Sequence, residues 1–368
     1  MTKAERRELQ ERQRAAKTAN QPNIKGPKPP HLVQPSQQQS PSSKQSQGMT
    51  HGPTPERGTR IFEHFGQPRH AGTLRSHVNN EADIHPAILK LGLQFAEFKL
   101  TGANARALAT LEGLKTVIQD YSTPQDAVLN RDLIRHLTPQ ITYIVSARGM
   151  SVSMGNAIRQ IKLHISNIPH DMPEQDNNLC SEIDNYIAEK IITADQVISS
   201  SAISKIQDGD VILTYARSSV VEKMLLQAHA ERRVFSVIIV DSRPMLEGKK
   251  LLKVLSSAGI SCTYCLLSAL GTVLSQVSKV FVGAHSLHAN GAVSSRAGTG
   301  AVATLAKAHG IPFLILCETY KYTPAAWLTQ LSPLYDLTPP SSITAVVTEV
   351  GIIPPNSLAW IPLSQAQQ

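Results

Sequence analysis

The sequence predicts an α/β fold in which an N-terminal helical bundle precedes a Rossmann-like, doubly wound and mostly parallel sheet, with a disordered N-terminal tail. Three observations predict it: an opening segment poor in apolar side chains, helical apolar spacing after Ile84, and alternation of short apolar runs with helical stretches after Asp210. We place the boundaries at 1–60 for the tail, 61–205 for the helical domain and 206–368 for the α/β domain.

The tail carries the net charge. Residues 1–80 hold 13 Lys or Arg against 5 Asp or Glu, whereas the remainder holds 23 against 23. Residues 2–18 are rich in Glu and Arg, so we expect a charged helix that cannot form a core alone. Residues 20–59 are dominated by Pro, Gln, Ser and Gly, a composition that buries too little apolar surface to fold.

The helical domain follows from apolar residues spaced at i, i+3, i+4 and i+7 between Ile84 and Ile118. We expect further helices beginning at Pro124 and spanning 151–168 and 181–203.

The α/β domain follows from six apolar runs that alternate with helical patterns. Strands are predicted at 210–215, 236–241, 260–267, 279–284, 312–317 and 343–349, and helices at 219–232, 247–258 and 295–309. Ser219 and Glu222 have the spacing of a capping box, which predicts a helix start directly after the first strand.

Composition excludes several classes of protein. No apolar run approaches the ~18 residues of a membrane span, so we expect no signal peptide or membrane helix and a cytosolic protein. Cys262 and Cys265 have metal-ligand spacing but no second pair nearby, and a strand turns them to opposite faces. We therefore expect neither a metal nor a cofactor.

Four apolar runs end in small or polar residues, as buried parallel strands do where they enter a ligand crevice. They are Val211–Ser218, Val237–Lys249, Val280–Gly291 and Pro312–Lys321.

The same segments resemble the family that unites the regulatory subunits of eukaryotic translation initiation factor 2B with the methylthioribose-1-phosphate and ribose-1,5-bisphosphate isomerases, its delta-type members above all. The resemblance spans roughly 84 to 362 and rests on an ordered series of motifs. These include Ile84-His-Pro-Ala87, Gly102-Ala-Asn-Ala-Arg106, Ser153-Met-Gly-Asn-Ala-Ile158, Val240-Asp-Ser-Arg-Pro244, Cys317-Glu-Thr-Tyr-Lys321 and Tyr335-Asp-Leu-Thr-Pro-Pro340.

The resemblance implies an isomerase-like pocket without its catalytic groups. Ala216, His285 and Thr101 stand where the isomerases carry a Cys, an Asp and a phosphate-binding Arg, and a methyl group can act neither as acid nor as base. Glu247 replaces a Gln, whereas Arg296 replaces a Lys and keeps the charge. Together with Arg217, these residues form the predicted vestigial pocket, and we expect no catalytic residue.

Four residues are candidates for binding a partner: Arg148, Ser151, Glu189 and Arg243. Arg148 precedes an expected helix start at Ser151 and either points to the crevice or lies on the surface; Gly149 replaces a family proline there. Arg243 either braces loops or meets a partner, and Glu189 lies opposite Ile187 and Ile191 on a helix, facing solvent or a partner.

By resemblance, the chain is a non-catalytic regulatory subunit of the guanine-nucleotide exchange factor for translation initiation factor 2. The implied partners are the beta, alpha, gamma and epsilon subunits in a decamer-like assembly, and the alpha subunit of initiation factor 2, whose phosphorylation would be sensed. An isomerase-like enzyme or sugar-phosphate sensor is the first alternative. The second is RNA binding by the basic tail, although nucleic acid is disfavoured because no aromatic residue precedes Phe62.

Overall fold

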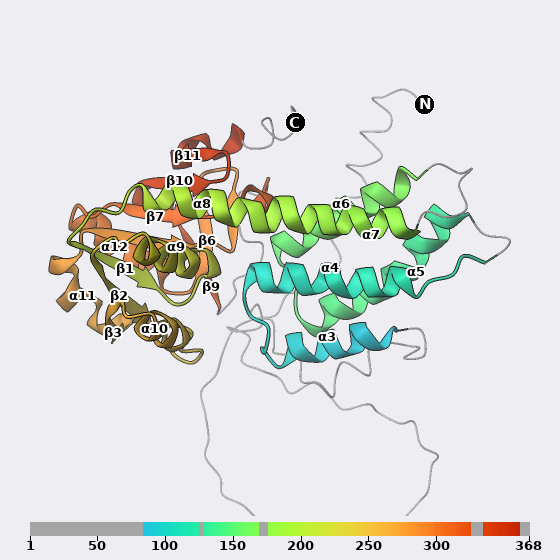
Figure 1. Cartoon of the computed structure of the whole chain (residues 1–368), viewed down its shortest axis with the longest axis horizontal. Helices are drawn as coiled ribbons and strands as arrows, with labels where there is room; N and C mark the ends of the chain where they lie inside the picture. The colour runs from blue at the N-terminus through green and yellow to red at the C-terminus, as the bar shows by residue number, and fades with distance from the viewer. Residues whose placement is uncertain (1–83, 125–127, 169–175, 325–333, 361–368) are drawn as a thin grey trace, which may run out of the picture. The chain divides into compact units, whose positions relative to one another are not determined.

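The computed structural model describes residues 84–124, 128–168, 176–324 and 334–360, and the predictions for the tail lie outside them. Helices come first and sheet strands begin at Asp210, which confirms the predicted α/β fold class with a mostly parallel sheet (Figure 1). None of the helices in these ranges is long and apolar enough to cross a membrane.

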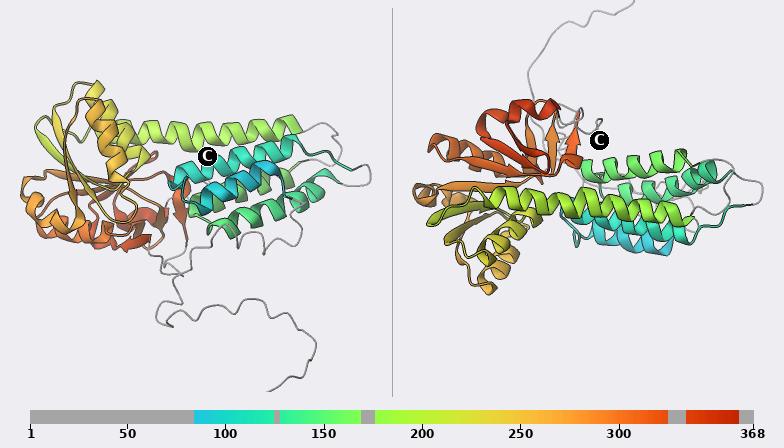
Figure 2. Two further views of the ribbon diagram at one scale, coloured as in Figure 1. Left: turned by 90° about the horizontal axis from the view of Figure 1, so that it is seen from below. Right: turned by 45° about the horizontal axis from the view of Figure 1, so that its top comes forward.

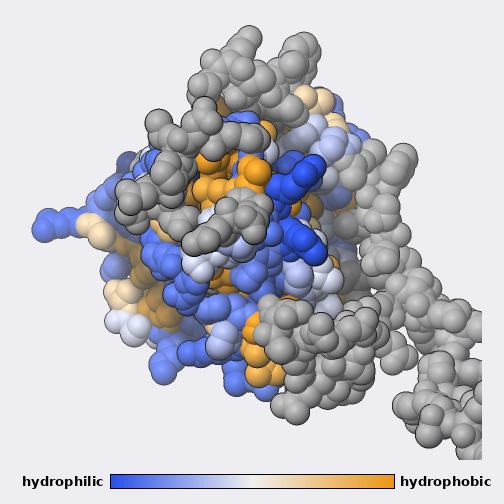
Figure 3. Space-filling view, turned by 90° about the vertical axis from the view of Figure 1, so that its right-hand side faces the viewer, coloured by the Kyte–Doolittle hydropathy of each residue, from blue (hydrophilic) through white to orange (hydrophobic). Residues whose placement is uncertain are grey.

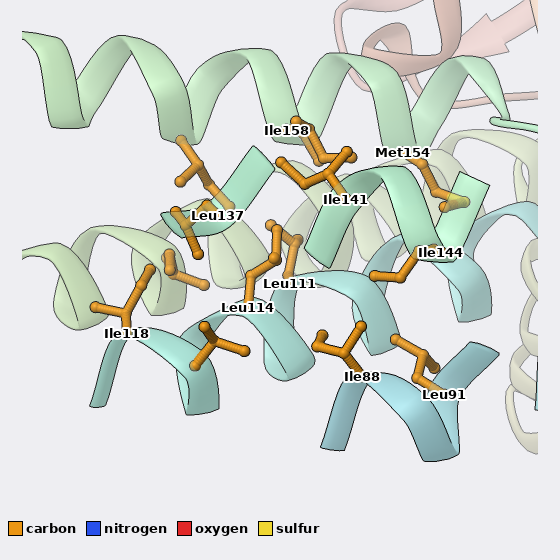
Figure 4. Close-up of a cluster of buried hydrophobic side chains, with 14 of the residues drawn as sticks. Ile88, Leu91, Leu111, Leu114, Ile118, Leu137, Ile141, Ile144, Met154 and Ile158 are labelled. Atoms are coloured by element: carbon orange, nitrogen blue, oxygen red, sulfur yellow. The ribbon is translucent and has the colours of Figure 1, made fainter. Parts of the chain in front are cut away.

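The helical part packs its apolar stripes around one core. Its first elements are α3 (Pro86–Ala96), α4 (Ala103–Gln119), α5 (Leu129–Ala147) and α6 (Val152–Ser166). Ile88, Leu111, Leu114, Ile144 and Met154 are completely buried where these helices meet (Figure 4). Helical periodicity therefore identified this core, because each helix has one apolar face to bury.

One helical run connects the helical part to the sheet. It comprises α7 (Asp176–Tyr186), the π-helical segment η4 (Ile187–Thr193) and α8 (Ala194–Ile203), a single rod in both views of Figure 2. The α-helix expected through 181–203 is therefore interrupted by a wider turn. Apolar spacing did not reveal this turn, because a single π-helical turn inside a longer helix changes the spacing only locally.

The main sheet has seven strands in the order β11-β10-β7-β4-β1-β2-β3, all parallel to their neighbours except β11 (Figure 1). The bounds are β1 (Asp210–Tyr215), β2 (Phe235–Asp241), β3 (Ser261–Leu266), β4 (Lys279–Gly283), β7 (Phe313–Leu316), β10 (Ala345–Thr348) and β11 (Gly351–Ile353). All six predicted strands are confirmed.

Helices cover both faces of this sheet, as expected for a doubly wound fold. α8, α9 (Ser219–Ala230) and α10 (Gly248–Ser257) cover one face, and α11 (Leu270–Val273) and α12 (Thr299–Ala308) contribute to the other. Cys262 and Cys265 pack into the cores on opposite faces, which confirms the expectation from their spacing.

A second sheet was not predicted. It has the order β8-β5-β6-β9 and consists of β5 (Ser286–His288), β6 (Val293–Arg296), β8 (Tyr322–Thr323) and β9 (Tyr335–Thr338). The helix expected from Ser295 therefore begins at Thr299, because Ser295 and Arg296 pair with β9 instead. These strands are too short and too polar to carry a periodic signal.

One predicted helix start is also wrong, and another is confirmed but with a different cap. α5 begins at Leu129 rather than at Pro124. α9 begins directly after the first strand, but Ser219 lies inside it and makes no capping hydrogen bond, since Ser218 is the N-cap residue. Glu222 instead accepts hydrogen bonds from Arg217, so Ser219 and Glu222 do not form a capping box despite their spacing.

Candidate functional site

A crevice of about 500 Å³ lies at the carboxyl ends of the parallel strands. Tyr215 and Arg217 line it from the end of β1, and Gly283 and His285 line it from the end of β4. Strand order reverses between these two neighbours, and open α/β sheets bind ligands at such a point. Thr101, which precedes α4, and the first residues of that helix close the crevice from the helical part.

Five of the six predicted pocket residues line this crevice: Thr101, Arg217, Glu247, His285 and Arg296. Ala216 instead lines an adjoining cavity of about 120 Å³, and Glu247 and Arg296 border both spaces. Ala216 adopts a left-handed backbone conformation, with φ of 57°, and its side chain is buried.

An internal ion pair occupies the centre of the site. Arg296 Nε donates to Glu247 Oε2 and Arg296 Nη2 donates to Glu247 Oε1, both at 2.8 Å. The guanidinium also lies over the Tyr335 ring, 5.1 Å from its centroid. Burial alone would lower the pKa of Arg296, but Tyr335 and Glu247 raise it above its ordinary value. The Glu247 carboxylate thus accepts from Nε and Nη2 of Arg296, the two donors that an external anion would need for bidentate binding.

His285 is held neutral. Its ring stacks on Tyr335 with centroids 4.1 Å apart. Burial, followed by the positive charges of Arg106, Lys321, Arg296 and Arg148, lowers the pKa of His285 to about 3. The side chain therefore cannot supply a proton near neutral pH, when a general acid would need to be protonated.

The remaining pocket residues are held by local contacts. Arg217 is engaged by Glu222, with Nε donating to Oε2 at 2.7 Å, and this hydrogen bond raises the pKa of Arg217. The carbonyl of Thr101 accepts from Arg296 Nη2 at 3.4 Å.

The predicted partner-binding residues are dispersed. Arg148 donates to the Leu100 carbonyl at 3.0 Å and covers the Phe98 ring, so it lies on the crevice side of the helical part. Ser151 is 2% exposed and accepts from the Met154 amide as the N-cap residue of α6.

Glu189 and Arg243 are exposed, on η4 and beside the smaller cavity respectively. Figure 3 shows the surface of the helical part. Where grey atoms do not cover it, this surface is mainly hydrophilic and carries separate hydrophobic patches.

Sequence reasoning missed a buried polar network between the helical part and the sheet. Asn104 Nδ2 donates to Glu318, the Tyr320 hydroxyl donates to Asn104 Oδ1 at 2.8 Å, and Lys321 pairs with Glu318 at 2.6 Å. Asp195 lies beside it on α8. The sequence does contain one signal for this network: the charged residue Asp195 interrupts the apolar stripe formed by Ile191 and Ile198.

Nothing in the described ranges fits a metal: no three His, Cys, Asp or Glu side chains are grouped closely enough to hold one. The four cysteines form no disulfide. Burial raises the pKa of Cys262, Cys265 and Cys317, which favours the protonated, unreactive thiol.

Comparison with known proteins identifies relatives of two kinds. The chain is 40% identical over 346 residues to translation initiation factor eIF2B subunit delta of Schizosaccharomyces pombe, covering 83% of this chain and 73% of the relative. It is 37% identical to the Dictyostelium discoideum subunit delta, covering 82% of this chain but only 56% of that longer relative. Ribose 1,5-bisphosphate isomerase of Pyrococcus furiosus is 28% identical, over 73% of this chain and 90% of the enzyme.

A solved structure also shows similarity to an eIF2B complex. The crystal structure of the tetrameric eIF2B-beta2-delta2 complex from C. thermophilum contains a chain that matches with a TM-score of 0.69 and 35% identity, covering 76% of this chain and 100% of that chain. Residues 99–332 match the Initiation factor 2 subunit family (IF-2B). With that match spanning more than half of its length, the chain belongs to the initiation factor 2 subunit family.

Proposed function

We propose that this chain is a non-catalytic, delta-type regulatory subunit of the guanine-nucleotide exchange factor for translation initiation factor 2, working in the cytosol. The observation that carries the proposal is the 40% identity to an eIF2B subunit delta over most of the chain. The beta2-delta2 tetramer of a relative supports a beta-type subunit as the direct partner. Alpha, gamma and epsilon subunits complete the proposed decamer-like assembly.

The geometry of the crevice supports a role without catalysis. Ala216 offers only a methyl group, and His285 is neutral near pH 7 because its pKa is about 3. The Arg296 guanidinium is already paired with the Glu247 carboxylate through two hydrogen bonds. An aldose-phosphate isomerase needs a proton donor, a proton acceptor and an anion clamp. Each of these three requirements is compromised by a residue of this chain.

Purification of the tagged full chain from its own cells tests the assembly. We expect a beta-type subunit at equal stoichiometry, identified by mass, with alpha, gamma and epsilon subunits at milder washing. Recovery of the chain alone, or with unrelated proteins only, would count against the proposal.

We also propose that the helical part senses phosphorylation of the alpha subunit of initiation factor 2 through an exposed surface that includes Glu189. Glu189→Lys should leave assembly unchanged, because exposed substitutions typically alter stability by under about 0.5 kcal/mol. It should change how strongly phosphorylated factor inhibits nucleotide exchange, since charge reversal alters complementarity with a charged partner.

The matched control is Glu231→Lys, a charge reversal at an exposed position that ends α9. Exchange rates would be measured against increasing phosphorylated factor for the parent and both variants. Superimposable curves for parent and Glu189→Lys would remove Glu189 from the sensing surface.

One observation favours an anion sensor as a second candidate function. Arg296 Nη1 is buried and finds no partner among the described residues, and the N-terminus of α4 lines the same crevice without a side-chain cap. Calorimetric titration with inorganic phosphate and ribose 1,5-bisphosphate separates the two candidates. Binding by the parent chain, lost in Arg296→Ala, would favour the sensor; binding that appears only in Glu247→Gln would show that Glu247 acts as the internal anion.

A further inference from the structure

Two carboxyl groups meet in the interior beside the crevice. Asp195 of α8 is 3% exposed, and Glu318, which follows β7, is completely buried. They lie within hydrogen-bonding range of each other. Two adjacent ionised carboxylates repel strongly when water is excluded, so this arrangement requires a compensating proton or cation.

One oxygen of Asp195 lacks a hydrogen-bond donor. Asp195 Oδ2 pairs with Lys223 and Glu318 Oε1 accepts from Asn104, whereas buried Asp195 Oδ1 receives no hydrogen bond from the described residues. Glu318 Oε2 instead forms an ion pair with Lys321 Nζ at 2.6 Å. A buried oxygen without a donor is costly, and a proton on Asp195 would remove this cost by turning its carboxyl into a donor towards Glu318.

The surrounding cations identify which group holds the proton. Lys321 is buried against Glu318, whereas the side chain of Lys223, the partner of Asp195, is 56% exposed and therefore screened by water. Tyr186, Cys317 and Tyr320 also lie near the pair, and the Glu349 carboxylate accepts hydrogen bonds from the amide of Thr319, next to Glu318. Burial raises the pKa of each of the first three, so they remain neutral.

We propose that Asp195 and Glu318 share one proton, carried by Asp195, and that releasing it near neutral pH loosens the contact between α8 and the end of β7. Burial, together with Glu318, raises the pKa of Asp195 to about 7. Burial would raise the pKa of Glu318 too, but Lys321, Asp195 and Asn104 outweigh it and leave that pKa below its ordinary value.

Asp195 and Glu318 lie where three elements that are distant in the sequence meet, so the shared proton affects all three. Asp195 and Lys321 line the crevice, and Glu318 is bonded to Asn104 at the start of α4. Loss of the proton leaves two facing negative charges where α4, α8 and the end of β7 meet. The crevice wall would therefore respond to pH through Asp195 and Glu318.

The test replaces the proton by a permanent donor. In Asp195→Asn the amide can donate to Glu318 at every pH. The folded-state pKa of Asp195 exceeds its unfolded value, so the folded chain binds more protons and stability falls as pH rises towards about 7. His285, whose pKa is lowered to about 3, makes stability rise with pH in both proteins, so the effect of Asp195 is the difference between them. Between about pH 6 and pH 7 the thermal midpoint of the parent should fall by roughly 2–4 °C relative to that of Asp195→Asn.

Asp210→Asn is the matched control, because Asp210 is a buried carboxylate paired with Lys279 at the other end of the sheet. It should lower the midpoint but keep the pH slope of the parent. An unchanged slope in Asp195→Asn would overturn the proposal.

A second measurement does not depend on the variant folding. Difference infrared spectra of the full parent chain, between about pH 6 and pH 8, should contain the carbonyl band of a buried carboxylic acid that disappears at the higher pH. Carbon-13 labelling of aspartate should shift this band, because the proton resides on Asp195. Absence of an isotope-sensitive acid band at the lower pH would equally overturn the proposal.

Discussion

At the scale of single residues, Ala216 is informative because it adopts a left-handed backbone conformation although it carries a Cβ. Its φ of 57° is one that a residue with a Cβ adopts at a cost of roughly 1–2 kcal/mol. The turn after β1 is therefore maintained by its surroundings, including the hydrogen bond from the Ala216 amide to the Val240 carbonyl at 2.8 Å.

We predict that Ala216→Gly raises the free energy of unfolding by up to about 1 kcal/mol, because glycine tolerates the left-handed conformation. Urea unfolding would measure it. The control is Ala301→Gly at an exposed position of α12, which should lower the free energy by about 1 kcal/mol. Equal losses in both variants would show that Ala216 is not strained.

At the scale of elements, the start of α6 combines a predicted partner residue with a structural role. The Ser151 hydroxyl accepts from the Met154 amide at 3.3 Å and contacts the Ser153 hydroxyl at 3.0 Å. Because Ser151 is almost fully buried, its contribution to stability has to be separated from any contribution to partner binding.

Ser151→Ala should therefore lower the free energy of unfolding by about 1 kcal/mol, the usual effect of losing an N-cap. Ser151→Gly should lower it by only a few tenths of a kcal/mol, because glycine exposes the helix terminus to other acceptors. Urea unfolding distinguishes them, and a glycine variant as unstable as the alanine variant would exclude capping as the explanation.

At the scale of the whole described region, a short segment after β7 joins the helical part to the sheet. Asn156 of α6 donates from Nδ2 to the carbonyls of Tyr320 and Tyr322, at 2.7 and 3.0 Å. The segment η7 (Thr319–Lys321) that carries the first acceptor is buried. Both carbonyls depend on one side chain, so its removal affects both parts together.

We predict that Asn156→Ala lowers the free energy of unfolding by about 2 kcal/mol, because two backbone acceptors lose their donor. Asn185→Ala, at an exposed position of α7, should change it by less than about 0.5 kcal/mol. Calorimetry would measure both. A loss confined to Asn185→Ala, or none in either variant, would contradict a connecting role for Asn156.

Local patterns along the chain are sufficient to predict the fold class, the six parallel strands and the edge of the sheet at which the crevice opens. Apolar runs and helical periodicity depend only on neighbours along the chain, and they locate β1 at Asp210–Tyr215 without any knowledge of its partners. The resemblance then pointed to Thr101, Glu247, His285 and Arg296, all of which line one crevice.

The interactions of those residues follow only from the folded arrangement of the chain. The second sheet pairs strands from 286 to 338 that are individually too short to signal themselves. The ion pair of Glu247 with Arg296 joins residues 49 positions apart, and the network of Asn104 with Glu318 joins residues 214 apart. Charge, burial and proton sharing at these sites depend on contacts between distant segments, which no local pattern of residue types contains.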